Sequence, residues 1–311
     1  MNDKSSVAVI CTPNNQASIA YDAIDSITAQ SVKPERLIVV HDKSETDAVA
    51  SLQKRIEKVM PDSQLVCIEH DSDTTFIAAR NIGLNHVGDC QYIHFVNSNI
   101  QLPKDFYEKA TRRLATQQDC MAAMPAKVKL VNGLDAAIYS DNFIKNPWLW
   151  LMRKKLEIAG AILLCSHAVE KAGKFNPLLL IGADTDFFAR ISNQSAWCYI
   201  PDCVVTLPLS QTKADIQSQF PDYYRRWALI YENLLDTYRA RDRIARKIYR
   251  PILAKAWFEA GQELLSHQRI EEAHDCFTRS LSWRLFNPAF KYLIKISRLR
   301  KKAHLSDTVG I

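Results

Sequence analysis

Four short apolar runs, separated by segments of a different pattern, occupy the first hundred residues and constrain the fold more than any other feature. Each run suits a buried strand, and the intervening segments place apolar residues at helical spacing around 19–27 and 52–59 and over 76–86. Strands and helices that alternate in this way predict βαβ units, a parallel sheet and right-handed crossovers. The predicted strands are residues 7–11, 37–40, 65–68 and 92–96.

The last of these runs stops abruptly at three small polar residues. Asn97, Ser98 and Asn99 follow it directly, and Leu102-Pro103 then opens a new helical pattern. Ligands of α/β sheets bind beyond the carboxyl ends of the strands, so the three polar residues stand where a substrate or its counter-ion would be held. The alternative is a polar turn between a strand and a helix.

Length and composition indicate a folded protein with more than one part. A chain of 311 residues exceeds one average domain, and we expect a main domain over 1–210 and a basic helical extension over 211–311. No run approaches eighteen consecutive apolar residues, and no signal-like block follows the N-terminus. The eight cysteines form no C-x-x-C pair, so we expect reduced thiols, without disulfides or zinc, in a cytoplasmic protein.

Charge is spread unevenly along the chain. Residues 1–210 carry 21 Lys and Arg against 23 Asp and Glu, a net −2, whereas residues 211–311 carry 19 against 11, a net +8. A basic part of this kind suits an anionic surface or an acidic partner. A solvated helical face is the alternative for any single cluster.

The pattern past Pro208 is helical. We expect one helix over 220–240 and a basic one from residue 239 that Pro251 interrupts. Residues 254–290 resemble a single tetratricopeptide-like hairpin, and an ordinary amphipathic helix pair is the alternative. One such unit cannot bury its face alone, so it must pack on neighbouring helices, on the first part or on another chain. The residues at the spacings of that motif are Trp257, Gly261, Ala273 and Phe277.

Four segments of the first half carry a family resemblance. The chain reads V-A-V-I-C-T-P-N at 7–14, V-V-H-D-K-S-E-T-D at 39–47, A-R-N-I-G at 79–83 and F-V-N-S-N-I-Q-L-P-K-D-F at 95–106. In this order they resemble motifs of the family 2 glycosyltransferases, and A-G-K-F-N at 172–176 with G-A-D-T-D-F-F-A-R at 182–190 resembles that family's acceptor-side segment. The resemblance implies the α/β GT-A fold, a mostly parallel sheet flanked by helices, here with an all-α extension.

The resemblance also implies an activity: inverting transfer of a sugar from a nucleotide-diphospho-sugar to a glycan or lipid-linked acceptor. Asp42 matches the family's base-contacting aspartate, and the Arg80 guanidinium would bind phosphate oxygens. Turn chemistry is the alternative for Thr12 and Asn14, and a surface salt bridge is the alternative for Arg80. The residues that match the nucleotide-sugar site are Thr12, Asn14, Asp42, Arg80, Asn97, Ser98 and Asn99.

The acceptor side of the resemblance supplies a candidate general base. Asp184 matches the second member of the family's acidic pair, whose first position holds Ala183 here, and would take the proton from the acceptor hydroxyl. Asp186, Trp148 and Trp150 complete the expected acceptor side. Helix capping is the alternative for the two aspartates, and core packing is the alternative for the two tryptophans.

The metal site departs from the family pattern. The family's D-x-D carboxylates hold Mg²⁺ or Mn²⁺ against the diphosphate, but this chain has Asn97 and Asn99, and an amide brings no negative charge. We therefore expect weak or no metal dependence, with Asn99 as a weak ligand. A catalytically inactive, transferase-like binding or scaffold protein is the alternative, whereas a nucleotide-binding oxidoreductase is disfavoured because residues 12–15 lack the glycines of a dinucleotide turn.

The basic tail suggests where the protein acts. Residues 298–302 and the basic helix around Arg246 would suit peripheral attachment at the inner face of the membrane, or contact with another protein, during surface polysaccharide or lipopolysaccharide assembly. Exposed helix charge is the alternative explanation. We expect no nucleic-acid partner.

Overall fold

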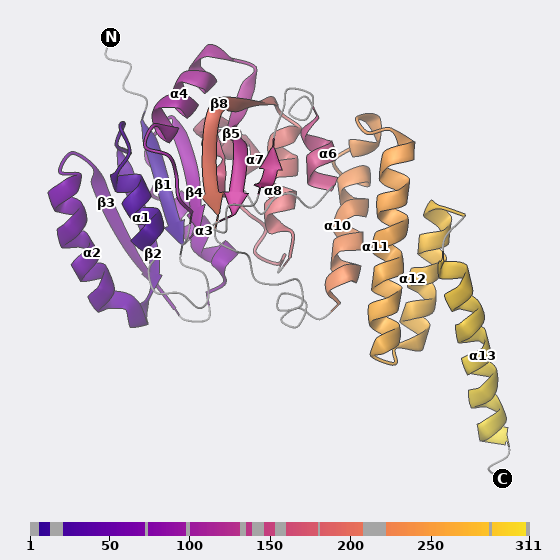
Figure 1. Ribbon diagram of the computed structural model, residues 1–311. Helices are drawn as coiled ribbons and strands as arrows, with labels where there is room; N and C mark the ends of the chain where they lie inside the picture. The colour runs from indigo at the N-terminus through magenta and orange to yellow at the C-terminus, as the bar shows by residue number, and fades with distance from the viewer. Residues whose placement is uncertain are drawn as a thin grey trace. The chain divides into compact units, whose positions relative to one another are not determined.

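The computed structural model describes residues 6–12, 21–71, 74–97, 100–130, 135–138, 146–152, 160–179, 181–207, 222–285 and 288–308. It divides into two compact units, one of Met1–Leu179 with Ala183–Ser210 and one of Leu180–Gly182 with Gln211–Ile311. Figure 1 traces the first unit from indigo to orange-red and the helices of the second from orange to yellow.

The first unit is built on one sheet in the order β3-β2-β1-β4-β7-β5-β6, with β8 paired to β5. The pairs β2–β3, β1–β2, β1–β4 and β5–β8 are parallel, and β4–β7, β5–β7 and β5–β6 are antiparallel. The predicted mostly parallel sheet is therefore confirmed. Its strands are β1 (Val7–Thr12), β2 (Arg36–Asp42), β3 (Gln64–His70), β4 (Tyr92–Asn97), β5 (Cys120–Leu130), β6 (Asp135–Ile138), β7 (Leu163–Cys165) and β8 (Ala196–Leu207).

Helices of the first unit pack on this sheet: α2 lies on β2 and β3, α3 on β1 and β2, and α4 on β5 and β8 (Figure 1). Gly83 lets α3 approach closely, since a Cβ there would lie 2.5 Å from Ile10 Cγ2. The helical elements are α1 (Tyr21–Thr28), η1 (Lys43–Glu45), α2 (Thr46–Val59), α3 (Phe76–Leu84), α4 (Phe106–Thr116), α6 (Pro147–Met152), α7 (Ser166–Ala172) and α8 (Ala183–Ser192).

The centre of the sheet is dry because its strands are almost wholly apolar. Residues 7–11 of β1 are at most 5% exposed, and residues 37–40 of β2 at most 1%. Helices on both faces of a parallel sheet favour continuous apolar strands of this kind. His94 of β4 is a buried polar exception: its Nε2 lies 2.6 Å from the Gly160 carbonyl and its Nδ1 lies 3.0 Å from the Tyr107 hydroxyl.

The second unit is helical, as predicted. Its elements are α10 (Tyr223–Asp236), η3 (Ala240–Asp242), α11 (Arg246–Ser266), α12 (Ile270–Trp283) and α13 (Ala289–Thr308). The expectation that Pro251 interrupts a helix is wrong, because α11 continues through it. Pro251 lies near the start of α11, where a missing N–H costs one helical hydrogen bond, and the buried Leu253, Ala254 and Trp257 that follow offset this cost.

A helical hairpin, α11 with α12, forms the centre of the second unit. Its close approach depends on Gly261, where a Cβ would lie 2.6 Å from the ring of the buried Phe277. Its kinship with tetratricopeptide repeats stays a prediction. Within the described ranges, no helix combines the length and apolar character needed to cross a bilayer.

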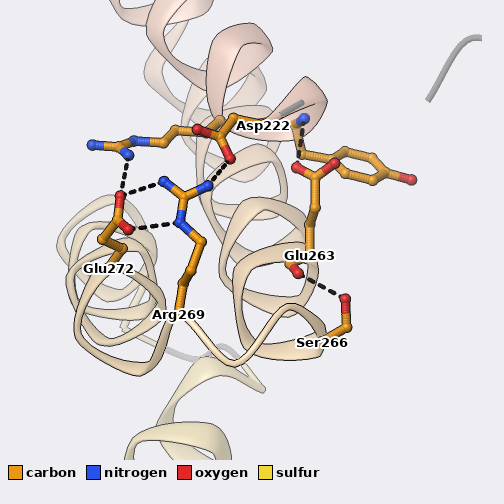
Figure 2. Close-up of polar contacts among 7 residues, drawn as sticks. Asp222, Glu263, Ser266, Arg269 and Glu272 are labelled. Carbon is orange, nitrogen blue, oxygen red and sulfur yellow. Dashed lines mark hydrogen bonds and ion pairs between the residues drawn. The ribbon is translucent and has the colours of Figure 1, made fainter. Parts of the chain in front are cut away.

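Charged side chains join the ends of these helices (Figure 2). Arg269, between α11 and α12, binds Glu272 through two nitrogens at 2.7 Å and also pairs with Asp222 at the start of α10. Glu272 in turn accepts a hydrogen bond from Arg225 at 2.7 Å, and the Glu263 carboxylate accepts one from the Tyr224 backbone N–H at 3.1 Å. The second unit thus gains a polar clamp at one end of its helices.

Candidate functional site

The carboxyl ends of β1, β2 and β4 bring three of the predicted site residues to one edge of the sheet. Thr12 and Asn97 are register partners on adjacent parallel strands, and Asp42 ends the neighbouring strand β2. The structure describes Asn97 at its backbone only. Asn14, Ser98 and Asn99 lie outside the described residues, so their predicted roles stay predictions.

Two of the edge residues have side chains whose settings are described. Thr12 is 2% exposed and ends a strand that is buried throughout. The Asp42 carboxylate accepts a hydrogen bond of 2.8 Å from the Ser44 backbone N–H, two residues on, which fixes its direction in the turn after β2. Burial raises the pKa of the neighbouring Cys11 thiol to about 12, so this thiol stays protonated at neutral pH and is no nucleophile.

A buried ion pair joins two segments that lie 104 residues apart in the sequence. Nη1 of Arg80, on α3, donates a hydrogen bond to Oδ1 of Asp184, in the first turn of α8. The Arg80 side chain is 1% exposed, whereas that of Asp184 retains 27% exposure. A carboxylate is also favoured in the first turn of a helix. The pair fixes one oxygen of Asp184 and leaves the rest of the carboxylate partly open to solvent.

Aromatic rings enclose the guanidinium of this pair. The Arg80 Cζ lies 4.2 Å from the ring centroid of Phe76, 5.2 Å from that of Phe175 and 5.8 Å from that of Phe95. Phe175 also stacks on Phe187 of α8, with centroids 4.0 Å apart. A guanidinium is less strongly hydrated than an ammonium and stacks on aromatic faces, which explains why arginine occupies this site.

Asn81, next to Arg80, ties the same two segments through the backbone. Its side-chain amide donates to the Phe175 carbonyl at 2.8 Å and accepts from the Phe175 N–H at 2.9 Å. The segment 79–83 therefore does three things: Arg80 holds Asp184, Asn81 holds the loop before α8, and Gly83 admits α3 to the sheet. The A-R-N-x-G pattern positions the start of α8 against the sheet edge.

Asp186 has a partner within its own helix. Its Oδ2 accepts hydrogen bonds from Nε and Nη2 of Arg190, at 3.2 and 2.9 Å, and the Arg190 Nη1 also donates to the Ala172 carbonyl. The Asp186 residue is 8% exposed. This arrangement ties α8 to the end of α7, and the acceptor-side role of Asp186 stays a prediction.

Trp148 and Trp150 on α6 lie in the core, each 1% exposed. The ring of Trp150 packs against that of Trp197 on β8, with centroids 5.4 Å apart. Core packing was the alternative to an acceptor-side role for these indoles, and their burial favours it.

The described residues do not form a divalent-cation site at the sheet edge. In the part of the chain that the structure describes, no group of three or more His, Cys, Asp or Glu side chains could hold a metal ion. Asp184, a carboxylate near this edge, is engaged by Arg80. Asn97 and Asn99 would bring uncharged oxygens. We derive no catalytic step through a metal.

Sequence reasoning missed the enclosure of Arg80. Phe76 and Phe175 carry no polar signal, and Asn81 was noted only as part of its motif. The spacing of Phe76 and Arg80, four residues apart on one helix, is a signal for an aromatic–cation pair that could have been recognised. The pairing of Arg80 with Asp184 has no such local signal.

Comparison with known proteins gives the family. The family model described as Glycosyl transferase family 2 matches residues 7–164. The solved structure of S. aureus TarS 1–349 in complex with UDP is similar, with a TM-score of 0.62 at 15% identity over 97% of this chain and 92% of that chain. The TarS structure with UDP-GlcNAc gives 0.61 at 14% identity over the same shares.

A mannosyltransferase, PcManGT from Pyrobaculum calidifontis in complex with GDP-Man and Mn²⁺, matches with a TM-score of 0.51 at 18% identity, over 94% of this chain and 79% of that chain. At such identities the likeness concerns the fold. No curated protein matches the chain. The family match spans more than half of the sequence and includes β1 through β4 with the Arg80 motif. This chain belongs to glycosyl transferase family 2.

Proposed function

We propose that this protein transfers a sugar from a nucleotide-diphospho-sugar to a hydroxyl of a glycan or lipid-linked acceptor, with inversion at the anomeric carbon. The observation that carries the proposal is the Arg80–Asp184 pair, which holds a partly exposed carboxylate next to the carboxyl edge of the sheet. Membership of the family and the fold shared with UDP-bound and GDP-Man-bound structures support it.

Asp184 acts as the general base. Its carboxylate takes the proton of the acceptor hydroxyl while that oxygen forms a bond to the anomeric carbon, and the bond from this carbon to the diphosphate oxygen breaks. The nucleoside diphosphate departs with the bonding electrons. Attack from the face opposite the leaving group inverts the configuration.

Arg80 positions Asp184 in this proposal. The alternative is that Arg80 binds the diphosphate, as expected from the sequence. Its 1% exposure and its bond to Asp184 favour positioning, because a phosphate ligand needs a guanidinium that solvent can reach. Thr12 and Asp42, at the ends of β1 and β2, are the residues proposed to hold the nucleoside, together with Asn14, Asn97, Ser98 and Asn99.

Metal dependence is proposed to be weak or absent, since the D-x-D positions carry amides. The same observation favours a second candidate, a transferase-like protein that binds a nucleotide or a partner without catalysis. In both cases the chemistry of Asn97 and Asn99 disfavours a divalent cation held by side chains alone.

Calorimetric titration tests nucleotide binding, which sugar transfer requires, and its dependence on metal. The purified protein is titrated with UDP, GDP and CDP, each with and without Mn²⁺. The proposal predicts binding of at least one nucleotide with a Kd that Mn²⁺ changes by less than about threefold. A gain of more than about tenfold with Mn²⁺ would contradict the proposed metal independence, and absence of binding to all three would favour the scaffold candidate.

A further inference from the structure

The basic charge of the second unit is concentrated in one stretch. Residues 276–306 hold eight Lys and Arg and no Asp or Glu, whereas the rest of 211–311 holds 11 of each sign. The whole net +8 of residues 211–311 therefore resides in the second half of α12, the turn after it and α13. Arg279 pairs with Glu232 of α10 at 3.4 Å, and the other basic residues of this stretch create a local positive field.

One face of α13 packs against the hairpin of α11 and α12, so the opposite face points away from that hairpin. Ala289 and Ile296 are 0% exposed, and the ring of Tyr292 stacks on that of Phe277 of α12 with centroids 4.9 Å apart. Gln262 of α11 donates a hydrogen bond of 2.9 Å to the Tyr292 hydroxyl. Residues on the far side of α13 therefore face away from the hairpin.

Large apolar side chains lie on that outward side. Phe290 is 61% exposed and Ile294 is 41% exposed, and their four-residue spacing places them in one line along the helix. Leu285, in the turn between α12 and α13, is 90% exposed. Of the seven exposed large apolar residues that the structure describes, these three lie within ten residues of one another in the sequence.

Basic residues flank this apolar line. Lys291 and Lys295 are exposed, and each follows one of the two apolar residues of the line directly in the sequence. Arg298 is exposed four residues after Ile294, in the same line along the helix. Arg284 is exposed next to Leu285. We name this surface the junction face. It consists of Arg284, Leu285, Phe290, Lys291, Ile294, Lys295 and Arg298.

We propose that the junction face binds the surface of an anionic lipid bilayer. Transfer of exposed apolar side chains into the boundary between headgroups and acyl chains lowers the free energy of the bound state. Lysine and arginine beside them are attracted by the negative surface potential of the membrane. The two sets of side chains lie next to each other on the exposed side of one helix. Arg300, Lys301 and Lys302 extend the basic sequence along α13.

A protein partner fits these observations less well. Protein interfaces are depleted in lysine at their centres, whereas Lys291 and Lys295 adjoin the apolar line here. A second copy that used the same face would bring like charges together, since 276–306 contains no acid to pair with them. Negatively charged lipid complements the face.

Vesicle co-sedimentation of the full chain tests the proposal, which does not depend on catalytic activity. Vesicles of phosphatidylcholine alone are compared with vesicles that contain one quarter phosphatidylglycerol, at 0.1 and 0.5 M NaCl. Binding is expected only to the anionic vesicles, and it should weaken at the higher salt concentration because screening shortens the range of the attraction.

Matched variants assign this binding to the face. Lys291→Gln with Lys295→Gln should weaken partitioning about 30-fold, since each charge near the surface contributes about fivefold. The control is Lys54→Gln with Lys58→Gln, an exposed pair at the same spacing on α2, which should leave binding unchanged.

A second pair of variants tests the apolar part. Leu285→Ser should weaken partitioning about tenfold, whereas Leu178→Ser in the first unit, where the side chain is 83% exposed, should not. All of these positions are exposed, so circular dichroism and thermal midpoints should match the wild type.

Several results would overturn the proposal. They are absence of binding to anionic vesicles, binding equal to that on neutral vesicles, and binding that the Lys54 and Lys58 control weakens as much as the Lys291 and Lys295 variant. Light scattering adds one more: a wild type that self-associates with rising concentration, and a Leu285→Ser variant that does not, would assign the face to a contact between copies.

Discussion

Both units contain an arginine that binds a carboxylate from a distant part of the chain, but the settings differ. Arg80 is 1% exposed, enclosed by phenylalanines and paired with Asp184. Arg269 binds Asp222 and Glu272 (Figure 2), and the side chains of these three residues are 38%, 24% and 40% exposed. The Arg80 guanidinium therefore lies among aromatic side chains with almost no exposure to solvent, whereas the Arg269 guanidinium is partly exposed.

The difference separates a positioning device from a structural clamp. A buried guanidinium loses its hydration, and removing one partner of a buried pair leaves an uncompensated charge, which fits the positioning role proposed for Arg80. Exposed pairs are screened by water and salt and contribute little each. Arg269 lowers the pKa of Glu272 through its hydrogen bonds, and Glu272 and Asp222 raise the pKa of Arg269 above its usual value, which describes a clamp on helix ends.

The largest effect is expected for the carboxylate of the buried pair. Asp184→Asn should lower the rate of sugar transfer by about 100- to 10,000-fold, because an amide cannot take the acceptor proton. The release of UDP from UDP-GlcNAc and of GDP from GDP-Man measures the rate. Nucleotide affinity should stay within about twofold, since the amide oxygen still accepts the bond from Arg80.

Asp186→Asn, two residues along α8, is the matched control for that variant. It should lower stability by weakening the bonds to Arg190, and it should preserve most of the turnover of the folded protein. If both variants lost turnover equally, Asp184 would not be distinguished as the general base from Asp186, which only binds Arg190 within α8.

Removing the buried cation should cost stability. Arg80→Met should lower the free energy of unfolding by about 3 kcal/mol, at the low end of the range for one partner of a buried pair because Asp184 is 27% exposed and can be hydrated. Denaturation in urea at 0.1 and 1 M NaCl measures it, and the deficit should be the same at both. If the loss of stability disappeared at 1 M NaCl, the Arg80–Asp184 pair would behave as a solvent-exposed ion pair, contrary to the prediction.

The buried His94 makes the stability of the first unit depend on pH. Burial lowers its pKa from 6.5 to about 4. Because the Gly160 carbonyl can only accept, Nε2 carries the hydrogen and Nδ1 accepts from the Tyr107 hydroxyl, so the ring is neutral. The unfolded chain binds more protons than the native one between pH 6.5 and 4, so stability falls as pH falls through this window.

The expected loss is about 3 kcal/mol from pH 7 to pH 4, since each pKa unit corresponds to about 1.4 kcal/mol. Hydrogen exchange of β4 peptides across this range measures it for the first unit alone. His94→Gln, which does not titrate, should flatten the profile between pH 6.5 and 4. An unchanged slope would show that the loss arises from other groups.

The smallest effect is expected for the exposed clamp. Arg269→Met should lower the stability of the second unit by less than Arg80→Met lowers that of the first, and this deficit should shrink as NaCl rises from 0.1 to 1 M, where the Debye length falls to about 3 Å. Hydrogen exchange of α10 and α12 peptides follows it. Arg269 lowers the pKa of Glu272. The stabilisation from this pair is therefore fully present above the ordinary glutamate pKa, and it is lost as the pH falls from that value through the lowered pKa.

The sequence predicted what depends on local patterns. Strands β1 to β4 and the carboxyl edge that presents Thr12, Asp42 and Asn97 follow from apolar runs and the polar residues that end them. Helices of the second unit follow in the same way. Pro251 does not end α11, because the buried residues that follow it offset the helical hydrogen bond that it cannot donate, and α11 begins at Arg246 rather than at residue 239.

Contacts between distant segments could not be predicted in this way. Nothing in the spacing of Arg80 and Asp184 indicates that they meet, because their contact depends on how α8 returns to the sheet after β7 and α7. The aromatic enclosure is equally non-local, since Phe76, Phe95 and Phe175 come from three elements or loops. Phe95 and Phe175 are buried core residues, and nothing in their local sequence indicates that they contact a guanidinium.

Arg80 is proposed to act through Asp184. A double-mutant cycle on the rate of nucleoside diphosphate release, with Arg80→Lys, Asp184→Asn and the double variant, tests this role. Arg80→Lys should slow the wild type but cost almost nothing further once Asp184 is asparagine. If the two losses instead multiply, and Arg80→Lys also weakens nucleotide binding, Arg80 acts on the diphosphate and the claim is contradicted.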